Sequence, residues 1–198
     1  MASNNVEYIK LTMVRENLQD IPRFAFPDGY RCRTFGRGEE GIWAEIESSV
    51  AEFKTTEKAL EHFREEFGPF LGDFESRCHF VENAEGKCIG TATAWYNRCF
   101  QGEEYGRLHW LGIVPDYQGR KLAKPLVCRV MNRLAASHDR AYLTTQTTSF
   151  RAIKVYLDFG FQPLILTENC PRAWHLMAKL LNHPKLNNDK RWHDWSNR

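Results

Sequence analysis

The 198-residue sequence lacks the long apolar segments that mark several protein classes. No stretch approaches the roughly 18 consecutive apolar residues of a membrane helix. The first residues show no charged start followed by an apolar run. We therefore expect no membrane span, no signal peptide and a cytoplasmic location. Internal repeats and low-complexity segments are also absent, and a hydrophobic share of 42% with a charged share of 26% is typical of a folded globular chain.

The sequence also lacks closely spaced cysteines and a strong charge of one sign. None of its six cysteines forms a Cys-x-x-Cys pair, so neither a zinc knuckle nor a redox pair is indicated, and we expect no metal. Reduced thiols in a cytosolic protein are the simpler interpretation. The net charge of +2 is too small for the basic face of a nucleic-acid binder, so we expect no nucleic-acid partner and no membrane partner.

The spacing of apolar residues predicts a mixed α/β chain. Residues 7–14 are expected to form an edge strand, and two amphipathic helices divide near Thr55, the second ending at Gly68 and Pro69. The remaining expected elements follow in chain order. Strands are predicted at residues 30–35, 77–82, 88–96, 107–114, 141–145, 161–167 and 174–179, and helices at residues 121–136 and 149–159. This order indicates a mixed α/β sheet.

The turn between the strand at 107–114 and the helix at 121–136 has the composition of a phosphate site. Backbone N–H groups at a helix start are unpaired and carry the positive end of the helix dipole, so they can bind an anion. Gly119 permits close approach of the backbone, and Arg120, Lys121 and Lys124 add positive charge. A basic helix start without a ligand has the same composition, so the turn alone leaves both interpretations open.

The sequence resembles the GNAT superfamily of N-acetyltransferases in two motifs over roughly residues 77–167. The first family signature is Gln/Arg-x-x-Gly-x-Gly/Ala after an apolar-x-Pro step, and its counterpart here is Ile113-Val114-Pro115 followed by Gln118, Lys121 and Ala123. The second is Asn-x-x-Ala, then Tyr-x-x-x-Gly-Phe, and its counterpart is Ser149 and Ala152, then Tyr156, Gly160 and Phe161. Lys121 replaces the usual glycine and Ser149 the usual asparagine. We expect the phosphate cradle to survive if Lys121 has a negative φ.

The resemblance implies a fold, a domain division and a co-substrate. The fold is a mixed, mostly antiparallel sheet flanked by helices, with splayed parallel central strands. The domain covers residues 29–180, after an N-terminal extension (1–28) and before a C-terminal tail (181–198). The implied co-substrate is acetyl-CoA (acyl-CoA). The residues expected to contact it are Leu111, Gly112, Ile113, Gln118, Gly119, Arg120, Lys121, Leu122, Ala123, Lys124, Ser149 and Ala152.

Acyl transfer from a thioester to an amine requires an acid for the departing thiolate and a base for the amine. The resemblance assigns the acid to Tyr156, whose phenol is protonated at neutral pH. A purely structural aromatic residue on the buried helix face is the alternative. His109 is the candidate base because histidine titrates near neutral pH, and residues 108–113 resemble the same strand of the arylalkylamine N-acetyltransferases. A histidine held in the sheet is the alternative, and Glu82 and Glu103 are weaker candidate bases.

The strand that carries His109 also sets the expected position of the cofactor. Regular alternation would place His109, Leu111 and Ile113 on one face and Trp110 and Gly112 on the other. A backbone N–H of this strand is a candidate donor to the oxyanion. Trp95, Tyr96 and Trp110 are candidates to line an acceptor pocket for an apolar or aromatic amine, and core packing explains these three residues at least as well.

The predicted function is transfer of an acetyl group from acetyl-CoA to a primary amine of a small molecule or peptide, by direct attack. The alternative is a catalytically inactive acyl-CoA-binding or regulatory module with the same fold, which Lys121 and Ser149 favour. The tail residues Trp192 and Trp195 suggest packing on the body or a partner surface, of which a homodimer is one form.

Overall fold

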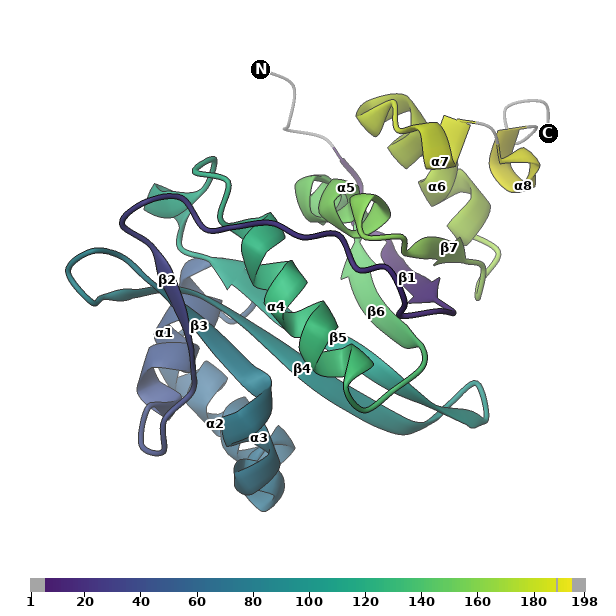
Figure 1. Ribbon diagram of the computed structural model, residues 1–198. Coiled ribbons are helices and arrows are strands. Elements are labelled where there is room, and N and C mark those ends of the chain that lie inside the picture. Colours follow the sequence, from purple (N-terminus) through teal and green to yellow (C-terminus); the bar gives the residue numbers. More distant parts are fainter. Residues whose placement is uncertain (1–5, 188, 194–198) are drawn as a thin grey trace. The chain divides into compact units, whose positions relative to one another are not determined.

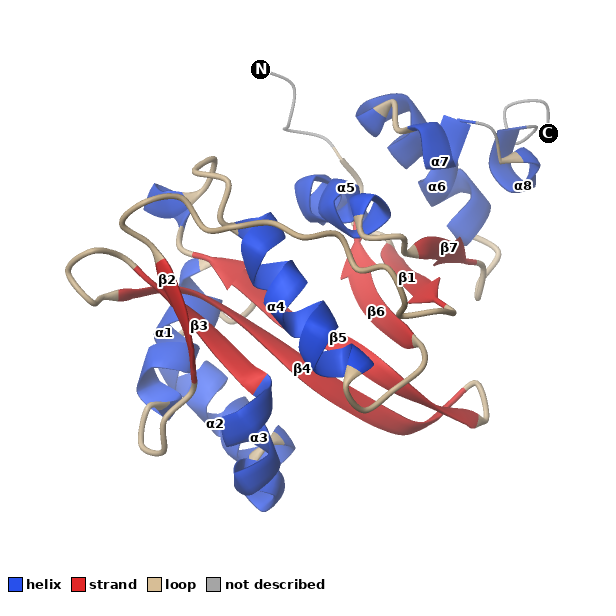
Figure 2. Ribbon diagram, in the orientation of Figure 1, coloured by secondary structure: helices blue, strands red, loops and turns tan. Residues whose placement is uncertain are grey.

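Figure 1 shows the computed structural model, which describes residues 6–187 and 189–193. The chain divides into two compact parts. One is Leu18–Asp139, and the other combines the chain before residue 18 with the chain after residue 139. Each part contains antiparallel strands flanked by helices (Figure 2), which confirms the mixed, mostly antiparallel α/β fold class. The predicted splay of central strands and the domain boundaries at 28/29 and 180/181 stay predictions.

The part Leu18–Asp139 has four strands in the order β2-β3-β4-β5, each antiparallel to the next. Their bounds are Arg31–Thr34 (β2), Cys78–Glu82 (β3), Cys88–Phe100 (β4) and Glu103–Ile113 (β5). Tight turns with Gly86 (φ 78°) and Gly102 (φ 84°) join β3 to β4 and β4 to β5. Glycine suits both turns because it adopts positive φ without a steric penalty.

Helices cover both faces of this sheet. The elements are α1 (Glu40–Ser49), α2 (Thr56–Glu66), the 3₁₀ turn Gly68–Phe70, α3 (Leu71–Arg77), the 3₁₀ turn Pro115–Tyr117 and α4 (Ala123–Ala135). α4 packs on one face of β3, β4 and β5, and α1 packs on β4 and β5 from the other face (Figure 1). Gly68 and Pro69 end α2 as predicted, but the chain then makes a further helix, α3, that the sequence analysis did not expect.

Aromatic side chains fill the core between the sheet and helices α1–α3. Phe63 of α2 and Phe67, the residue that caps the C-terminal end of α2, are almost completely buried. The ring of Trp43 of α1 lies 5.3 Å from Phe63 and 5.9 Å from Phe67. Phe67 lies 4.3 Å from Phe74 of α3 and 4.9 Å from Trp95 of β4. The predicted apolar spacing of α1 and α2 is therefore the spacing that builds this core.

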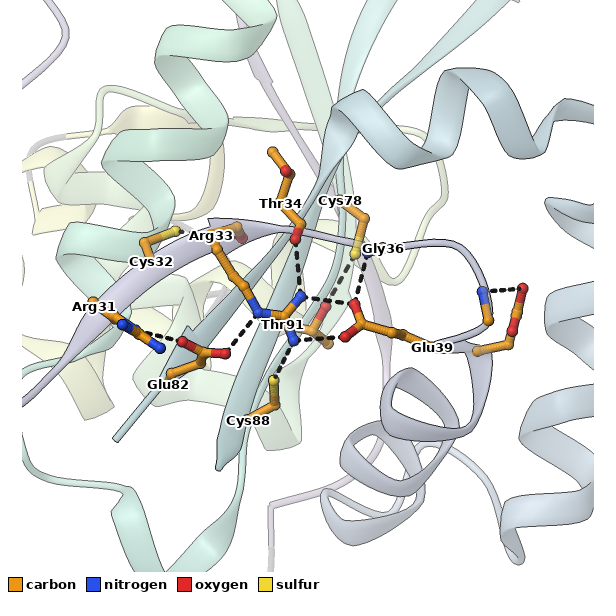
Figure 3. A network of polar contacts seen from close by, with 12 residues as sticks. Arg31, Cys32, Arg33, Thr34, Gly36, Glu39, Cys78, Glu82, Cys88 and Thr91 are labelled. Carbon is orange, nitrogen blue, oxygen red and sulfur yellow. Dashed lines mark hydrogen bonds and ion pairs between the residues drawn. The ribbon is translucent and has the colours of Figure 1, made fainter. Parts of the chain in front are cut away.

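A network of charged side chains ties β2 to the start of α1 (Figure 3). The Arg33 guanidinium donates to both Glu39 oxygens at 2.7 and 2.8 Å, and its Nε donates to Glu82 at 2.6 Å. Arg31 donates to the other Glu82 oxygen at 2.5 Å. Glu39 also accepts from the backbone N–H of Gly36, so the loop before α1 is held at both ends. Bidentate arginine–carboxylate pairs of this kind are geometrically specific.

The second part has three antiparallel strands in the order β6-β1-β7. β1 (Lys10–Arg15) pairs with β6 (Ala141–Gln146) on one side and with β7 (Gln162–Leu164) on the other. The prediction of an edge strand at residues 7–14 was therefore wrong. Leu11 and Met13 are buried, which explains the apolar alternation, but alternation does not distinguish an edge strand from an inner one.

Helices complete this second part. They are the 3₁₀ turn Thr147–Ser149, α5 (Phe150–Asp158), α6 (Cys170–Leu181), α7 (Pro184–Asn187) and α8 (Lys190–His193). The strand predicted at residues 174–179 was wrong, because that segment belongs to α6. Its buried residues Cys170, Ala173, Trp174 and Met177 follow helical spacing. Asn182 ends the helix in the left-handed conformation.

The C-terminal tail packs within its own part of the chain. Trp192 is 1% exposed, its ring lies 6.2 Å from that of Trp174, and its Nε1 donates to the Leu186 carbonyl. The alternative that this residue packs on the body is the one observed, whereas Trp195 lies outside the described residues. None of the described helices is both long and apolar enough to cross a bilayer.

Candidate functional site

β5 is irregular where it carries the candidate base. On β4, Thr93 pairs with His109 and Thr91 pairs with Gly112, so two steps on β4 correspond to three on β5. The extra residue lies at Trp110, whose φ of 48° is in the left-handed region. His109 and Gly112 consequently share a face, and the predicted alternation was wrong. One inserted residue reverses the side on which every following side chain points.

Glu66, at the C-terminal end of α2, is the centre of a hydrogen-bonded cluster. Its Oε1 lies 2.7 Å from His109 Nε2, and its Oε2 lies 2.8 Å from both Trp110 Nε1 and His62 Nε2. The Arg107 guanidinium is 3.7 Å from Oε1. The bulge lets the consecutive residues His109 and Trp110 reach the same carboxylate, which a regular strand does not allow.

The protonation states in this cluster follow from its contacts. Burial by itself raises the pKa of Glu66, but the hydrogen bonds from His109, Trp110 and His62 outweigh burial and lower the pKa to about 2. Burial lowers the pKa of His109 to about 4, against the opposing hydrogen bond to Glu66. At neutral pH the pair is therefore a carboxylate and a neutral imidazole.

The same contacts fix the tautomer of His109. A carboxylate only accepts hydrogen bonds, so the Nε2 atom of His109 carries the hydrogen and Nδ1 keeps a lone pair. Within residues 6–187 and 189–193 no hydrogen bond to Nδ1 is found. The arrangement is that of a neutral histidine oriented by a partly accessible carboxylate. The pKa of His109, about 4, lies below the near-neutral value that the sequence analysis expected.

Trp110, which donates to Glu66, packs among other aromatic rings, and the Glu66 side chain is 22% accessible. The Trp110 ring lies 5.2 Å from Phe53, 5.2 Å from His62 and 5.6 Å from Trp43. A carboxylate among aromatic faces can bind an organic cation or the amine of an apolar molecule. Of the three aromatic residues considered for an acceptor pocket, Trp110 belongs to this cluster, whereas Tyr96 contacts Asp73 and Arg77 instead.

The predicted phosphate turn follows β5 and leads into α4. Gly119 has a φ of 78°, and the Gln118 side chain donates to the Ile113 carbonyl at 2.9 Å. Arg120 donates to the Tyr30 hydroxyl and to the Asp116 carbonyl, both at 3.1 Å, and Lys124 lies over the Phe24 ring. Gln118 therefore supports the turn from within, and the two cations have protein contacts in the ligand-free chain.

Lys121 does not have the negative φ that was expected. Its φ is 63°, in the left-handed region, and the following Leu122 has a right-handed helical conformation. A left-handed residue next to a right-handed one turns successive N–H groups into one concavity, which is an anion-binding arrangement. Lys121 thus adopts the conformation that a glycine would provide, and a backbone cradle at the start of α4 is present.

Replacing Lys121 with glycine is expected to keep the affinity for CoA within about threefold, whereas proline should weaken it by about tenfold or more. Glycine keeps the left-handed backbone, while proline fixes φ near −65°. Calorimetric titration with CoA measures both effects, and Lys124→Ala is the control that removes a nearby charge without changing the backbone. Equal losses in the glycine and proline variants would mean that the lysine side chain, rather than the backbone, holds the ligand.

The residues of the second motif lie in the other part of the chain. Ser149 precedes α5 and accepts a hydrogen bond from Gln146 at 2.9 Å, but its side chain makes no capping hydrogen bond to α5. Ala152 and Tyr156 are on α5. Tyr156 is 6% exposed, and its ring lies 6.3 Å from Phe161.

The other candidate bases have different surroundings. Glu82 is held by Arg31 and Arg33 (Figure 3), so its carboxylate already has charged partners. Glu103 is the first residue of β5, next to the turn from β4. Among the described residues no group of three His, Cys, Asp or Glu side chains is arranged to hold a metal ion.

The sequence analysis missed two carboxylates on this side of the sheet. Glu66 is separated from His109 by 43 positions, and its place in a run of glutamates resembles a solvated surface. Glu47 of α1 is fully buried, and neither of its oxygens has a hydrogen-bond partner among the described residues. Glu47 follows Trp43 by four positions, so its place on the buried stripe of α1 was readable from helical spacing.

The chain is similar to known proteins in sequence and in fold. A mycothiol acetyltransferase of Saccharomonospora viridis is 29% identical over 161 residues, covering 73% of this chain and 49% of that protein. The solved GCN5-related N-acetyltransferase of Sphaerobacter thermophilus shares the fold, with a TM-score of 0.60 at 20% identity over 78% of this chain and 48% of the other. A glucosamine N-acetyltransferase region of a fungal multi-domain protein has a TM-score of 0.58 at 13% identity over 81% of this chain and 20% of the other.

The chain spans about half the length, or less, of these relatives. The sequence profile described as the acetyltransferase (GNAT) family matches residues 43–161, which is more than half of the chain. The match covers β5, the cradle and α5. The chain therefore belongs to the GNAT family of acetyltransferases, whose members use acetyl-CoA as co-substrate.

Proposed function

We propose that this chain transfers the acetyl group of acetyl-CoA to a primary amine by direct attack of the amine on the thioester. The observation that carries the proposal is the Glu66–His109 pair at the bulge of β5, a neutral imidazole oriented by a carboxylate. Membership of the family supplies the co-substrate, and the pair supplies a base. The acceptor is the amine of a small molecule or of a peptide.

His109 Nδ1 accepts the proton of the attacking amine. Glu66 receives the hydrogen bond from Nε2 and stabilises the imidazolium that forms, as the third member of a catalytic triad does. The proton leaves the nitrogen as the new amide bond forms, and the electron pair of the C–S bond leaves with the sulfur. Tyr156 donates a proton to that thiolate.

The cradle from Gln118 to Lys124 holds the pyrophosphate of the co-substrate through backbone N–H groups at the start of α4. The backbone of Leu111, Gly112 and Ile113 pairs with the extended arm of CoA, and the resemblance to the family assigns Ser149 and Ala152 to CoA contacts as well. The left-handed Lys121 next to the right-handed Leu122 supports this role for the turn.

The aromatic cluster of Phe53, His62 and Trp110 beside Glu66 supports an acceptor amine that carries an apolar or aromatic group. A panel of tryptamine, phenylethylamine, short peptides and glucosamine samples this chemistry. Glucosamine is included because one similar structure is described as a glucosamine N-acetyltransferase region. Release of the free CoA thiol, followed with a thiol reagent, measures turnover for each amine.

Replacing Tyr156 with phenylalanine is expected to lower kcat by at least about tenfold with the best amine, because the thiolate loses its proton donor. The ring and its packing remain, so the fold should not change. Tyr8→Phe is the matched control, since Tyr8 is 59% exposed in the same part of the chain. Unchanged turnover by the Tyr156 variant would remove this residue from the mechanism. Binding of acetyl-CoA without turnover of any amine would favour the inactive module.

A further inference from the structure

Glu47 is a buried carboxyl group without a partner in the protein. It lies on α1, its side chain is completely buried, and both oxygens lack a hydrogen bond among the described residues. Such groups are rare in folded proteins, because an unsatisfied buried polar atom costs about 1–3 kcal/mol. An unpaired carboxyl group of this kind calls for a functional explanation.

The carboxyl group packs directly on the backbone of β5 at Gly112. A Cβ atom added to Gly112 would lie 3.1 Å from Glu47 Oε1, and 3.3 Å from a methyl carbon of Val50. Because glycine has no side chain, the Glu47 carboxyl group occupies the space beside the backbone of Gly112. The bulge at Trp110 separates Gly112 from His109, and both residues lie on the same face of β5. Glu47 and the candidate base His109 are therefore at the same irregular segment of the strand.

We propose that Glu47 is a hydrogen-bond donor to the carbonyl oxygen of the acyl group of bound acyl-CoA. The proposal rests on the proposed function, which lays the acyl-CoA along Leu111–Ile113. No proton is transferred in this step. The O–H of the acid points to the oxygen on which negative charge develops as the amine attacks, and it withdraws when the carbonyl is restored. Among the described residues Glu47 has no side-chain hydrogen bond that must break before it donates.

The state of Glu47 suits a donor better than a base. Burial raises the pKa of Glu47 well above its usual value, and the neighbouring charge of Glu52 raises it further. Cys78 of β3 is the other titratable group in electrostatic contact, and burial raises the pKa of its thiol to about 12, so it is also neutral. A carboxylic acid kept neutral in an apolar site can donate to an oxyanion, as in ketosteroid isomerase.

Two variants of Glu47 separate a donor from a base and from a structural residue. Glu47→Gln keeps a donor of the same shape, so kcat should stay within about tenfold of the unmodified protein. Glu47→Met keeps the volume but removes the donor, so kcat should fall by about 100-fold or more with little change in the KM for acetyl-CoA. Thermal stability should be equal or higher in the methionine variant, because an unsatisfied buried group is gone. Glu45→Gln and Glu45→Met are the controls, since Glu45 is exposed on the same helix.

Each kinetic outcome decides the proposal. Equal loss of activity in the glutamine and methionine variants would identify a base and overturn the donor role, and full activity in both would leave Glu47 structural. The unmodified protein is assayed first with the amine panel. If the unmodified protein turns over no amine of the panel, the proposed function fails. If it is active, the comparison of Glu47→Gln with Glu47→Met tests the donor role of Glu47.

Infrared difference spectroscopy provides a measurement that needs no amine and no active variant. The C=O stretch of a protonated carboxyl group should appear in the unmodified protein and disappear in Glu47→Gln. Acetyl-CoA should shift this band, while CoA, which has no acyl carbonyl, should not. A band that is absent, or that responds equally to both ligands, would contradict the proposal even if the protein acetylates no amine.

Discussion

Replacing His109 with glutamine is expected to lower kcat/KM by about 100-fold to 10,000-fold, the range that a positioned base contributes. The glutamine amide can still donate to Glu66, so the link between β5 and α2 is kept while the proton acceptor is lost. Steady-state release of CoA thiol with the best amine of the panel measures the change. Circular dichroism and thermal unfolding establish that the variant is folded.

Glu66→Gln tests the partner of this base. We expect kcat to fall by about 10-fold to 100-fold, because the imidazolium loses the negative charge that stabilises it. The acid limb of the kcat–pH profile should also move to lower pH, since removing the carboxylate lowers the pKa of His109 further below its value of about 4. A residue that only supports the fold would lower the active fraction without moving the limb.

The matched control for Glu66 is its neighbour. Glu65 is exposed on the same helix, so Glu65→Gln removes the same charge and should leave both kcat and the pH profile unchanged. A His109→Gln variant with more than half of the original kcat/KM would exclude His109 as the base. Glu82 and Glu103 would then be the remaining candidate bases.

The predictable features of the chain are those that depend on local periodicity or on two linked motifs. The apolar stripe of α2 and the two strands on either side of Gly86 are local, and the structure contains them at the expected places. The turn at Gly102 was not predicted, and β4 and β5 extend to it beyond their expected ends. The motif around Gln118 and Lys121 lies at the start of α4 as expected, but the conformation of Lys121 was not foreseen, and the phosphate site stays a prediction. A lysine in the left-handed region is uncommon, and composition does not reveal it.

The features that escaped prediction depend on tertiary pairing. The bulge at Trp110 exists because β5 inserts one residue against β4, and no property of the Trp110 side chain requires it. Strict alternation therefore assigned the wrong face to Gly112. The Glu66–His109 contact joins α2 to β5, and it follows only once the helix is docked on the sheet. The expected strand at 174–179 covers only two of the four buried positions of α6, and the helical spacing becomes visible only when Cys170 and Ala173 are included.

Glu47 is the opposite case, because its position on the buried stripe of α1 is visible in the local sequence. A glutamate between Trp43 and Val50 on one helical stripe conflicts with a purely apolar core. Conflicts between a local pattern and the fold tend to concentrate at functional sites. The same residue also enters the response of the fold to acid, together with His79 and His109.

Acid is expected to destabilise the protein between pH 6.5 and 4 through His79 and His109. Burial lowers the pKa of each histidine to about 4, and Arg129 and Arg133 add to the shift at His79. In this interval the unfolded chain binds a proton on each histidine and the folded chain does not. Stability from these histidines is therefore fully present above pH 6.5 and is lost as the pH falls toward 4, by roughly 1.4 kcal/mol per pH unit for each proton.

Glu47 acts in the opposite direction over the same interval. Because burial raises its folded pKa well above 4.5, the folded chain keeps a proton that the unfolded chain releases. Glu47→Met should therefore increase the slope of the unfolding free energy against pH by the equivalent of about one proton. His79→Leu should decrease this slope by the equivalent of about one proton. Urea unfolding between pH 7 and 4.5 measures these slopes. If the two variants and the unmodified protein gave parallel lines, the carboxyl group of Glu47 would not be neutral in the folded chain, and its role as a hydrogen-bond donor would fail with it.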